Sequence, residues 1–418
     1  MANSGNSIFE KIGLPKNLKW GYLGILIFMM GDGIEQGWLS PYLTNQGGLS
    51  LEDSALVFTV YGVTIAISSW LSGVMADTYG VRKTMFIGLV LYCLGVAGFT
   101  GLGLQSFDYP IILLTYGFKG LGYPLFAYTF MVWIAYKTPR KRLSTAQGWF
   151  WFVFTGGLNV LGTYYSRFAL SRLGPINLLY TAIIFALTGA LFALLLNPFD
   201  KKNVKSTTGI GEKLRELGKG FTILKREPKV LLAGIVRTIN TTPQFAFLVF
   251  LPAFMARNGF PEQDWLFIWG TIFIGNILFN VLYGALGDKI GWRKTIIWFG
   301  AISAAIGVLL FFYSAIFSNN IYVVTACGLV WSIALAGFVP LSALTPSLVK
   351  EDKGSAVSIL NLGAGLPVFV GPALVGIFHR FIGDTGLIWL FASLYVTAAI
   401  LTVFIVPRKE NQEPGVKY

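Results

Sequence analysis

The chain has 418 residues, of which 55% are hydrophobic and only 12% are charged, and its mean hydropathy is +0.66. Soluble domains carry about 25% charged residues, so this composition indicates a polytopic membrane protein and excludes a large separate soluble domain. The formal net charge of +13 does not indicate nucleic-acid binding, because the basic residues lie in short segments between apolar runs.

Apolar runs long enough to cross a bilayer recur along the whole chain. At about 20 apolar residues per span, the sequence predicts an all-α membrane protein with twelve transmembrane helices in two pseudo-symmetric six-helix bundles. We expect no cleavable signal peptide, because the first apolar run is itself long enough to span. The expected spans are 20–43, 55–76, 84–106, 109–135, 145–166, 175–196, 229–256, 265–286, 295–317, 321–349, 355–378 and 386–406.

The distribution of Lys and Arg predicts the orientation. Of the 32 basic residues, 26 lie in alternate connecting segments that begin with residues 1–19, and 4 lie in the other connections. Lys119 and Arg237 lie within spans. Because basic residues favour the cytoplasmic side, both termini and the central connection are expected in the cytoplasm.

The first span carries two carboxylates, Asp32 and Glu35, in an otherwise apolar run. On a helix they share one face, with Gln36 beside them. A charge at mid-bilayer costs about 2.5–3.5 kcal/mol, which favours a functional role, either in proton coupling or in substrate binding. The alternative is that the pair only locks helices together through a buried base.

The fourth span offers that base. Lys119 is the expected counter-ion of Asp32 or Glu35, and Tyr116 and Tyr123 lie three residues before it and four residues after it on the same helical face. We expect Asp32, Glu35 and Lys119 to couple transport to protons, because a carboxylate balanced between desolvation and a nearby cation can take up and release a proton.

The longest polar stretch lies between the sixth and seventh spans. It divides the chain into an N-terminal bundle (1–196), a cytoplasmic linker (197–228) and a C-terminal bundle (229–418). Within the linker, GEKLRELGKGFTILKREP has the pattern of a short basic amphipathic helix on the membrane surface, and a plain solvated linker is the alternative.

The seventh span has a polar stripe on one helical face, formed by Arg237, Asn240, Thr241 and Gln244. Donors and acceptors in this mixture suit a ligand covered in hydroxyl groups. Each such residue taken alone is more often a packing or helix–helix contact than a ligand contact. Further candidates for substrate binding, which also include Gln36, Tyr116 and Tyr123 above, are Trp151, Asn159, Trp269, Asn276, Asn280, Trp331 and Asn361.

One motif occurs twice. The pattern G-x-x-x-D-x-x-G-x-R-K-T spans residues 73–84 and recurs at 284–295, an offset of 211 or about half the chain. Such a repeat predicts two related bundles with a binding site between them. We expect the first glycine to allow close helix approach and the Asp to pair with the Arg or a helix end, as a conformational latch or as a static turn. The latch candidates are Gly73, Asp77, Gly80, Arg82, Gly284, Asp288, Gly291 and Arg293.

The sequence offers little for an enzyme. It has no nucleophile–histidine pair, no metal-ligand cluster and no phosphate-binding loop, so we expect no enzymatic activity, no cofactor and no metal. Cys93 and Cys327 fall in spans and are interpreted as packing residues. His379, at the end of a span, is expected to be an interfacial residue.

The repeated loop motif resembles the signature of the major facilitator superfamily, and the resemblance covers nearly the whole chain. It implies the twelve-helix fold and alternating access. Thr78 departs from the usual pattern, in which a base follows the Asp. The stretch EKIGLPKNLKWGYLGILIFMMGDGIEQGWLSPYL at residues 10–43 is more narrowly similar to the bacterial polyol permeases that carry ribitol and D-arabinitol. This resemblance implies a multi-pass protein of the bacterial plasma membrane.

The function predicted from these features is import of a small polyol, such as a pentitol, by proton symport. The alternatives are a proton-coupled organic-anion or sugar symporter, with Lys119 and Arg237 binding a carboxylate, and a transport-dead membrane sensor. The expected partners are the substrate, protons and lipid, with no nucleic acid, and a monomer is expected.

Overall fold

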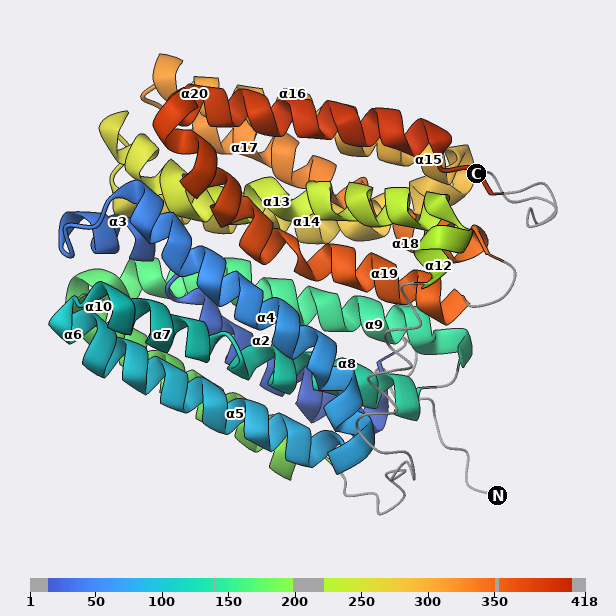
Figure 1. Cartoon of the computed structure of the whole chain (residues 1–418), viewed down its shortest axis with the longest axis horizontal. Coiled ribbons are helices and arrows are strands. Elements are labelled where there is room, and N and C mark those ends of the chain that lie inside the picture. Colours follow the sequence, from blue (N-terminus) through green and yellow to red (C-terminus); the bar gives the residue numbers. More distant parts are fainter. Residues whose placement is uncertain (1–13, 139, 198–221, 350–352, 408–418) are drawn as a thin grey trace. The chain divides into compact units, whose positions relative to one another are not determined.

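The computed structural model describes residues 14–138, 140–197, 222–349 and 353–407, and within these ranges every regular element is helical (Figure 1). The chain divides into two compact units. The first contains residues 1–36 and 67–211, and the second contains residues 37–66 and 212–418. Helix α4 (Leu51–Tyr79) therefore contributes its first half to the second unit and its second half to the first. The domain boundaries expected from the sequence stay a prediction.

The first unit begins with the short helix η1 (Lys16–Leu18) and holds the longer helices of the N-terminal half. Three π-helical segments continue these helices: η2 (Phe99–Gly103), η3 (Gly156–Leu161) and η4 (Leu191–Leu195). The helices are α2 (Lys19–Gly33), the end of α4, α5 (Val81–Gly98), α6 (Leu104–Ser106), α7 (Tyr109–Lys119), α8 (Gly122–Lys137), α9 (Arg140–Thr155) and α10 (Gly162–Ala190).

The second unit combines the short helix α3 (Leu39–Asn45) and the start of α4 with the C-terminal half. Of the expected surface helix in the linker, residues 198–221 lie outside the described residues, and α12 covers its end. The remaining elements are α12 (Thr222–Arg226), α13 (Pro228–Arg257), α14 (Glu262–Ile290), α15 (Trp292–Lys294), η5 (Thr295–Ile302), α16 (Ser303–Phe317), α17 (Ile321–Ala336), α18 (Leu341–Ser347), α19 (Lys353–Gly365) and α20 (Pro367–Phe404).

These helices account for the twelve expected spans. Eight stretches of the described chain are long and apolar enough to cross a membrane. Two of them, Gly148–Leu195 and Pro367–Phe404, are each divided into two helices at Gly174 and Gly383, where the backbone is not helical. The first and fourth spans are each built from two shorter helices, α2 with α3 and α7 with α8. The predicted fold class is confirmed.

Glycines bring α2 against its neighbours in the first unit. A Cβ atom at Gly33 would lie 2.0 Å from the carbonyl oxygen of Leu158, and one at Gly24 would lie 2.5 Å from the carbonyl oxygen of Gly189. Only glycine fits such backbone contacts, which are how membrane helices pack closely without a hydrophobic driving force. Helix α2 is thereby fixed against η3 and α10, and this packing holds the end of α2 in place.

The two copies of the repeated motif form the same local structure. Gly80 precedes α5 with φ of +86°, and Gly291 precedes α15 with φ of +111°. Both conformations are readily reached only by glycine. The first glycine of the motif was expected to allow close helix approach. In the first copy this is not observed, since no atom of the described residues lies within 4 Å of a Cβ built at Gly73.

The arginine of each copy binds the end of the last helix in its own unit. Arg82 Nη2 donates to the carbonyl oxygen of Asn197 at 2.6 Å, and Arg293 donates to the carbonyl oxygens of Thr402 and Val403. Unpaired carbonyl groups at a helix C-terminus favour a cation. The side chains of Asp77 and Asp288 lie outside the described part of the chain, so the expected latch stays a prediction.

We predict that Gly80→Ala destabilises the protein by about 1–3 kcal/mol, the cost of a backbone conformation reserved for glycine. No atom of the described residues lies within 4 Å of a Cβ at this position, so the cost is conformational and not steric. Gly73→Ala is the matched control, because it lies in the same motif but inside α4, where alanine is favoured over glycine. Thermal unfolding in detergent measures both. Equal stability of the two variants would contradict this account.

Candidate functional site

The candidate site in the first unit forms where helices α2 and α7 end, each inside one of the expected membrane spans. Helix α2 ends at Gly33, one residue after Asp32, and Glu35 follows in a turn that separates α2 from α3. Helix α7 ends at Lys119, and a turn at residues 120–121 precedes α8. Asp32 and Glu35 were expected on one helical face; they lie instead on either side of a helix end. These breaks aim the side chains of both carboxylates at Lys119.

Lys119 pairs with both carboxylates. Its Nζ atom lies 2.6 Å from Glu35 Oε1 and 3.2 Å from Asp32 Oδ1, and all three side chains are at least 94% buried. The sequence-based prediction that Lys119 is their counter-ion is confirmed as a contact. The lysine also ends α7, where a cation is favoured by the helix dipole.

Two tyrosines complete this cluster, which we call the Lys119 cluster (Asp32, Glu35, Lys119, Tyr116 and Tyr92). Tyr116 OH donates a hydrogen bond to Glu35 Oε1 at 2.7 Å. The ammonium of Lys119 lies 5.4 Å from the ring centres of both Tyr92 and Tyr116, within the range of cation–π attraction. Tyr92, on α5, was missed by the sequence analysis.

A close approach of α5 and α7 makes the Lys119 cluster possible. A Cβ at Gly95 would lie 2.4 Å from the Cα of Lys119. Gly95 lies three residues after Tyr92 on the same face of α5. The only available sequence signal for Tyr92 was therefore this Tyr–Gly spacing in an apolar span.

With both acids ionised, the Lys119 cluster carries two negative charges and one positive charge. An uncompensated charge is costly in a buried site, so the cluster has room for one exchangeable proton shared among its carboxylates. Both carboxylates accept bonds in the present arrangement, and a proton on either one would remove a partner of Lys119. This chemistry suits proton binding coupled to a rearrangement.

The remaining first-unit candidates lie outside the Lys119 cluster. Tyr123 is the second residue of α8 and packs on Tyr128 and Phe154. Trp151, on α9, is 38% exposed. Asn159 is buried in η3, and the side-chain oxygen of Gln36 is buried without a hydrogen-bond partner among the described residues.

The second unit holds an aromatic cluster beside the polar stripe of α13. The ring of Trp331 lies 4.8 Å from Phe247 and 6.1 Å from Trp269, and its Nε1 donates to Tyr395 OH at 3.1 Å. Tyr395 OH in turn donates to the carbonyl oxygen of Asn240 at 3.0 Å. Tyr395, on α20, was also missed by the sequence analysis; its partners are far away in the chain.

Unsatisfied polar atoms mark this part of α13 and α14. Asn240 Oδ1, Trp265 Nε1 and Trp269 Nε1 are buried and have no hydrogen-bond partner among the described residues. A buried polar group left unpaired costs about 1–3 kcal/mol. One acceptor and two donors are therefore available for a ligand or for water.

The other second-unit candidates form two groups and one separate residue. Asn276 Nδ2 donates to the carbonyl oxygen of Ser332 at 2.8 Å and so links α14 to α17, whereas Asn280 Nδ2 donates to Asn276 Oδ1 at 3.3 Å within α14. Arg237, Thr241 and Gln244 share the stripe with Asn240 on α13, which continues through Pro243. Asn361 is exposed on α19. Within the described residues no group of three or more His, Cys, Asp or Glu side chains could hold a metal.

Comparisons with known proteins agree with this architecture. The family model described as Major Facilitator Superfamily matches residues 21–274 and 234–417. The alpha-ketoglutarate permease of Bacillus subtilis is 45% identical, with 97% of this chain and 93% of the relative aligned. The D-arabinitol transporter of Klebsiella pneumoniae is 38% identical, with 97% and 95% aligned.

A solved structure shows the same fold. The D-xylose–proton symporter superposes with a TM-score of 0.72 at 18% sequence identity, over 94% of this chain and 98% of that one. Members of this family are transporters and not enzymes. With the family model covering both halves and two relatives matching nearly end to end, the chain belongs to the major facilitator superfamily and is a multi-pass membrane transport protein.

Proposed function

We propose that this transporter imports a small polyol, such as a pentitol, by proton symport. The observation that carries the proposal is the Lys119 cluster, in which two buried carboxylates share one ammonium. Such a cluster provides a proton site without a net positive charge to attract an anion. Similarity to the D-arabinitol transporter supports the substrate class.

The second unit contributes the hydrogen-bonding groups in this proposal. Asn240 and Trp269 provide an acceptor and a donor that the described residues leave unpaired. A hydroxyl group both donates and accepts, so a polyol can satisfy both kinds.

A dicarboxylate is the second candidate substrate, because the chain is 45% identical to an alpha-ketoglutarate permease. In that case Arg237 on α13 would bind a carboxylate in a charge-assisted bond. The Lys119 cluster would still carry the proton, and the transported species would enter with its charge partly neutralised. The two candidates therefore share a coupling site and differ in the role of Arg237.

Transport in proteoliposomes separates the two substrates. One proton moving through 100 mV gains about 2.3 kcal/mol, which at about 1.36 kcal/mol per tenfold supports roughly fifty-fold accumulation of a neutral solute. We expect labelled ribitol or D-arabinitol to accumulate and a protonophore to abolish the accumulation. Accumulation of 2-oxoglutarate without competition by pentitols would replace the polyol proposal with the dicarboxylate one.

Neutral variants test the proton site. We expect Glu35→Gln or Asp32→Asn to lose pH-driven accumulation while keeping substrate exchange, because exchange does not require release of the proton. Asp264→Asn, in the first turn of α14 and outside the Lys119 cluster, serves as the control and should keep both activities. If both cluster variants retain pH-driven accumulation, the proton site is elsewhere.

Stability tests the charge balance. Lys119→Met leaves two carboxylates buried without their cation, and we expect a loss of about 3–5 kcal/mol, as for other broken buried ion pairs. The triple variant Asp32→Asn, Glu35→Gln and Lys119→Met removes every charge and should regain most of that loss in thermal unfolding. A triple variant as unstable as Lys119→Met would show that shape, not charge, sets the cost.

A further inference from the structure

The first half of α4 packs against α20 within the second unit. A Cβ at Gly62 would lie 2.5 Å from the backbone nitrogen of Phe369, and a Cβ at Gly376 would lie 3.4 Å from the Cβ of Ala55. Glu52 lies in the first turn of α4, one helical turn before Ala55. The packing therefore brings the start of α4 beside the part of α20 that precedes Gly383.

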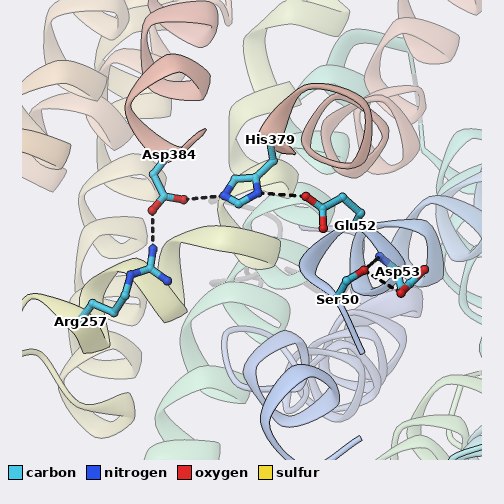
Figure 2. Close-up of polar contacts among 6 residues, drawn as sticks. All are labelled: Ser50, Glu52, Asp53, Arg257, His379 and Asp384. Atoms are coloured by element: carbon cyan, nitrogen blue, oxygen red, sulfur yellow. Dashed lines mark hydrogen bonds and ion pairs between the residues drawn. The ribbon is translucent and has the colours of Figure 1, made fainter. Parts of the chain in front are cut away.

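A chain of charged side chains crosses this contact. His379 Nδ1 lies 3.3 Å from Glu52 Oε1, and His379 Nε2 lies 3.1 Å from Asp384 Oδ1. The other oxygen of Asp384 accepts from Arg257, the last residue of α13. Figure 2 shows the imidazole ring between the two carboxylates, with one ring nitrogen directed at each. We call these four residues the His379 chain.

The geometry of the His379 chain requires a particular protonation state. A neutral imidazole has one N–H donor and one lone pair, whereas the imidazolium has two donors. Both ring nitrogens here face a carboxylate oxygen. Only the imidazolium donates to both, and a neutral ring turns a lone pair towards one carboxylate. Loss of the proton must therefore break one of the two contacts.

The surrounding charges identify the weaker contact. Asp384 is also held by Arg257. The contact of His379 with Glu52 is the longer of its two contacts, at 3.3 Å, and Glu52 belongs to a different helix, α4. Arg380 is next in the chain, and Glu262 and Asp264 lie in the first turn of α14. The neutral ring keeps Asp384, which is only five residues away in the chain, and releases Glu52.

His379 lies in the last turn of α20 before the break at Gly383, and its side chain is 23% exposed. The hydrogen bond to Asp384, assisted by the one to Glu52, raises the pKa of His379 above its ordinary 6.5, against the lowering effect of burial. Because the pKa of His379 is raised, its contact with Glu52 is fully formed below the ordinary pKa of 6.5 and is lost as the pH rises through the raised pKa.

We propose that His379 is a second proton-binding site of this protein, distinct from the Lys119 cluster, and that its proton fastens the start of α4 to α20. The orientation expected from the Lys and Arg distribution puts this contact on the outer side of the membrane. External acid then holds α4 against α20, and external alkali releases it. The role in transport depends on the proposed function; the binding of the proton and the release of α4 do not.

Spin-label distances test the release without any substrate. Labels at Leu56→Cys and Phe381→Cys, both exposed positions, report the separation of the start of α4 from α20 in a background without Cys93 and Cys327. Between about pH 5.5 and pH 8.5, the range over which a histidine titrates, we expect a longer-distance population to appear. Across the two pH units centred on the His379 pKa, the neutral fraction rises about tenfold, and this population should rise with it.

Variants assign the effect. His379→Gln should remove the pH dependence of the distance, and His379→Lys should keep the short distance at both pH values. Arg380→Gln, the neighbouring cation on the same helix, is the matched control and should titrate like the unsubstituted protein. A pH dependence that survives His379→Gln, or the absence of any change in the unsubstituted protein, would overturn the proposal.

A reversible cross-link tests whether the release matters to transport. The Cβ separation of 3.4 Å between Ala55 and a residue placed at Gly376 is close to that of a disulfide. We expect the oxidised Ala55→Cys, Gly376→Cys protein to lose transport and to regain it on reduction, while each single-cysteine protein is unaffected by oxidation. Undiminished transport by the oxidised protein would show that α4 and α20 stay together, and would overturn the assigned role of the proton.

Discussion

The structure of the first unit depends on one buried interaction, the contact of Lys119 with Asp32 and Glu35. Charges in a membrane interior are costly unless they are paired. The pairing is achieved by ending α2 and α7 at the same place, and by Gly33 and Gly95, which let neighbouring backbones approach. The helix breaks, the glycines and the tyrosines around the lysine all serve this arrangement.

The same constraint connects local structure to function. A cluster with one more acid than base can bind a proton on one of its carboxylates. That proton would remove a contact of the carboxylate with Lys119, and this contact joins two helices. Glu35 accepts from Tyr116 on α7 as well as from Lys119. Loss of its charge would therefore loosen α7 from the end of α2. In this proposal, the binding of one proton changes how the helices pack.

Much of the fold was predictable from the sequence, and the reasons are physical. The length of apolar runs is set by the bilayer, so twelve spans were expected, and the helices of the described residues account for them. The recurrence of the motif at 73–84 and 284–295 predicted related local structures, and Gly80 and Gly291 do share a positive φ. The contact of Lys119 with Asp32 and Glu35 was expected because charges within apolar spans have few other partners.

Other features could not be read from the sequence. The end of α2 at Gly33 arises from packing, so the expectation of one continuous helical face missed it. Tyr395 acts through Trp331 and Asn240, 64 and 155 residues away in the chain. His379 was expected to be an interfacial residue, and nothing local predicted a contact with Glu52, 327 residues distant. Such partners are brought together by helix packing, and no regular spacing in the sequence marks them.

The most direct test of the account is a count of the protons exchanged when ribitol binds to the purified protein in weakly buffered solution, followed with a pH-sensitive dye. The account predicts that binding changes the number of bound protons, and that the Asp32→Asn, Glu35→Gln double variant binds ribitol without that change. A double variant that exchanges as many protons as the unsubstituted protein would contradict the central role of the Lys119 cluster.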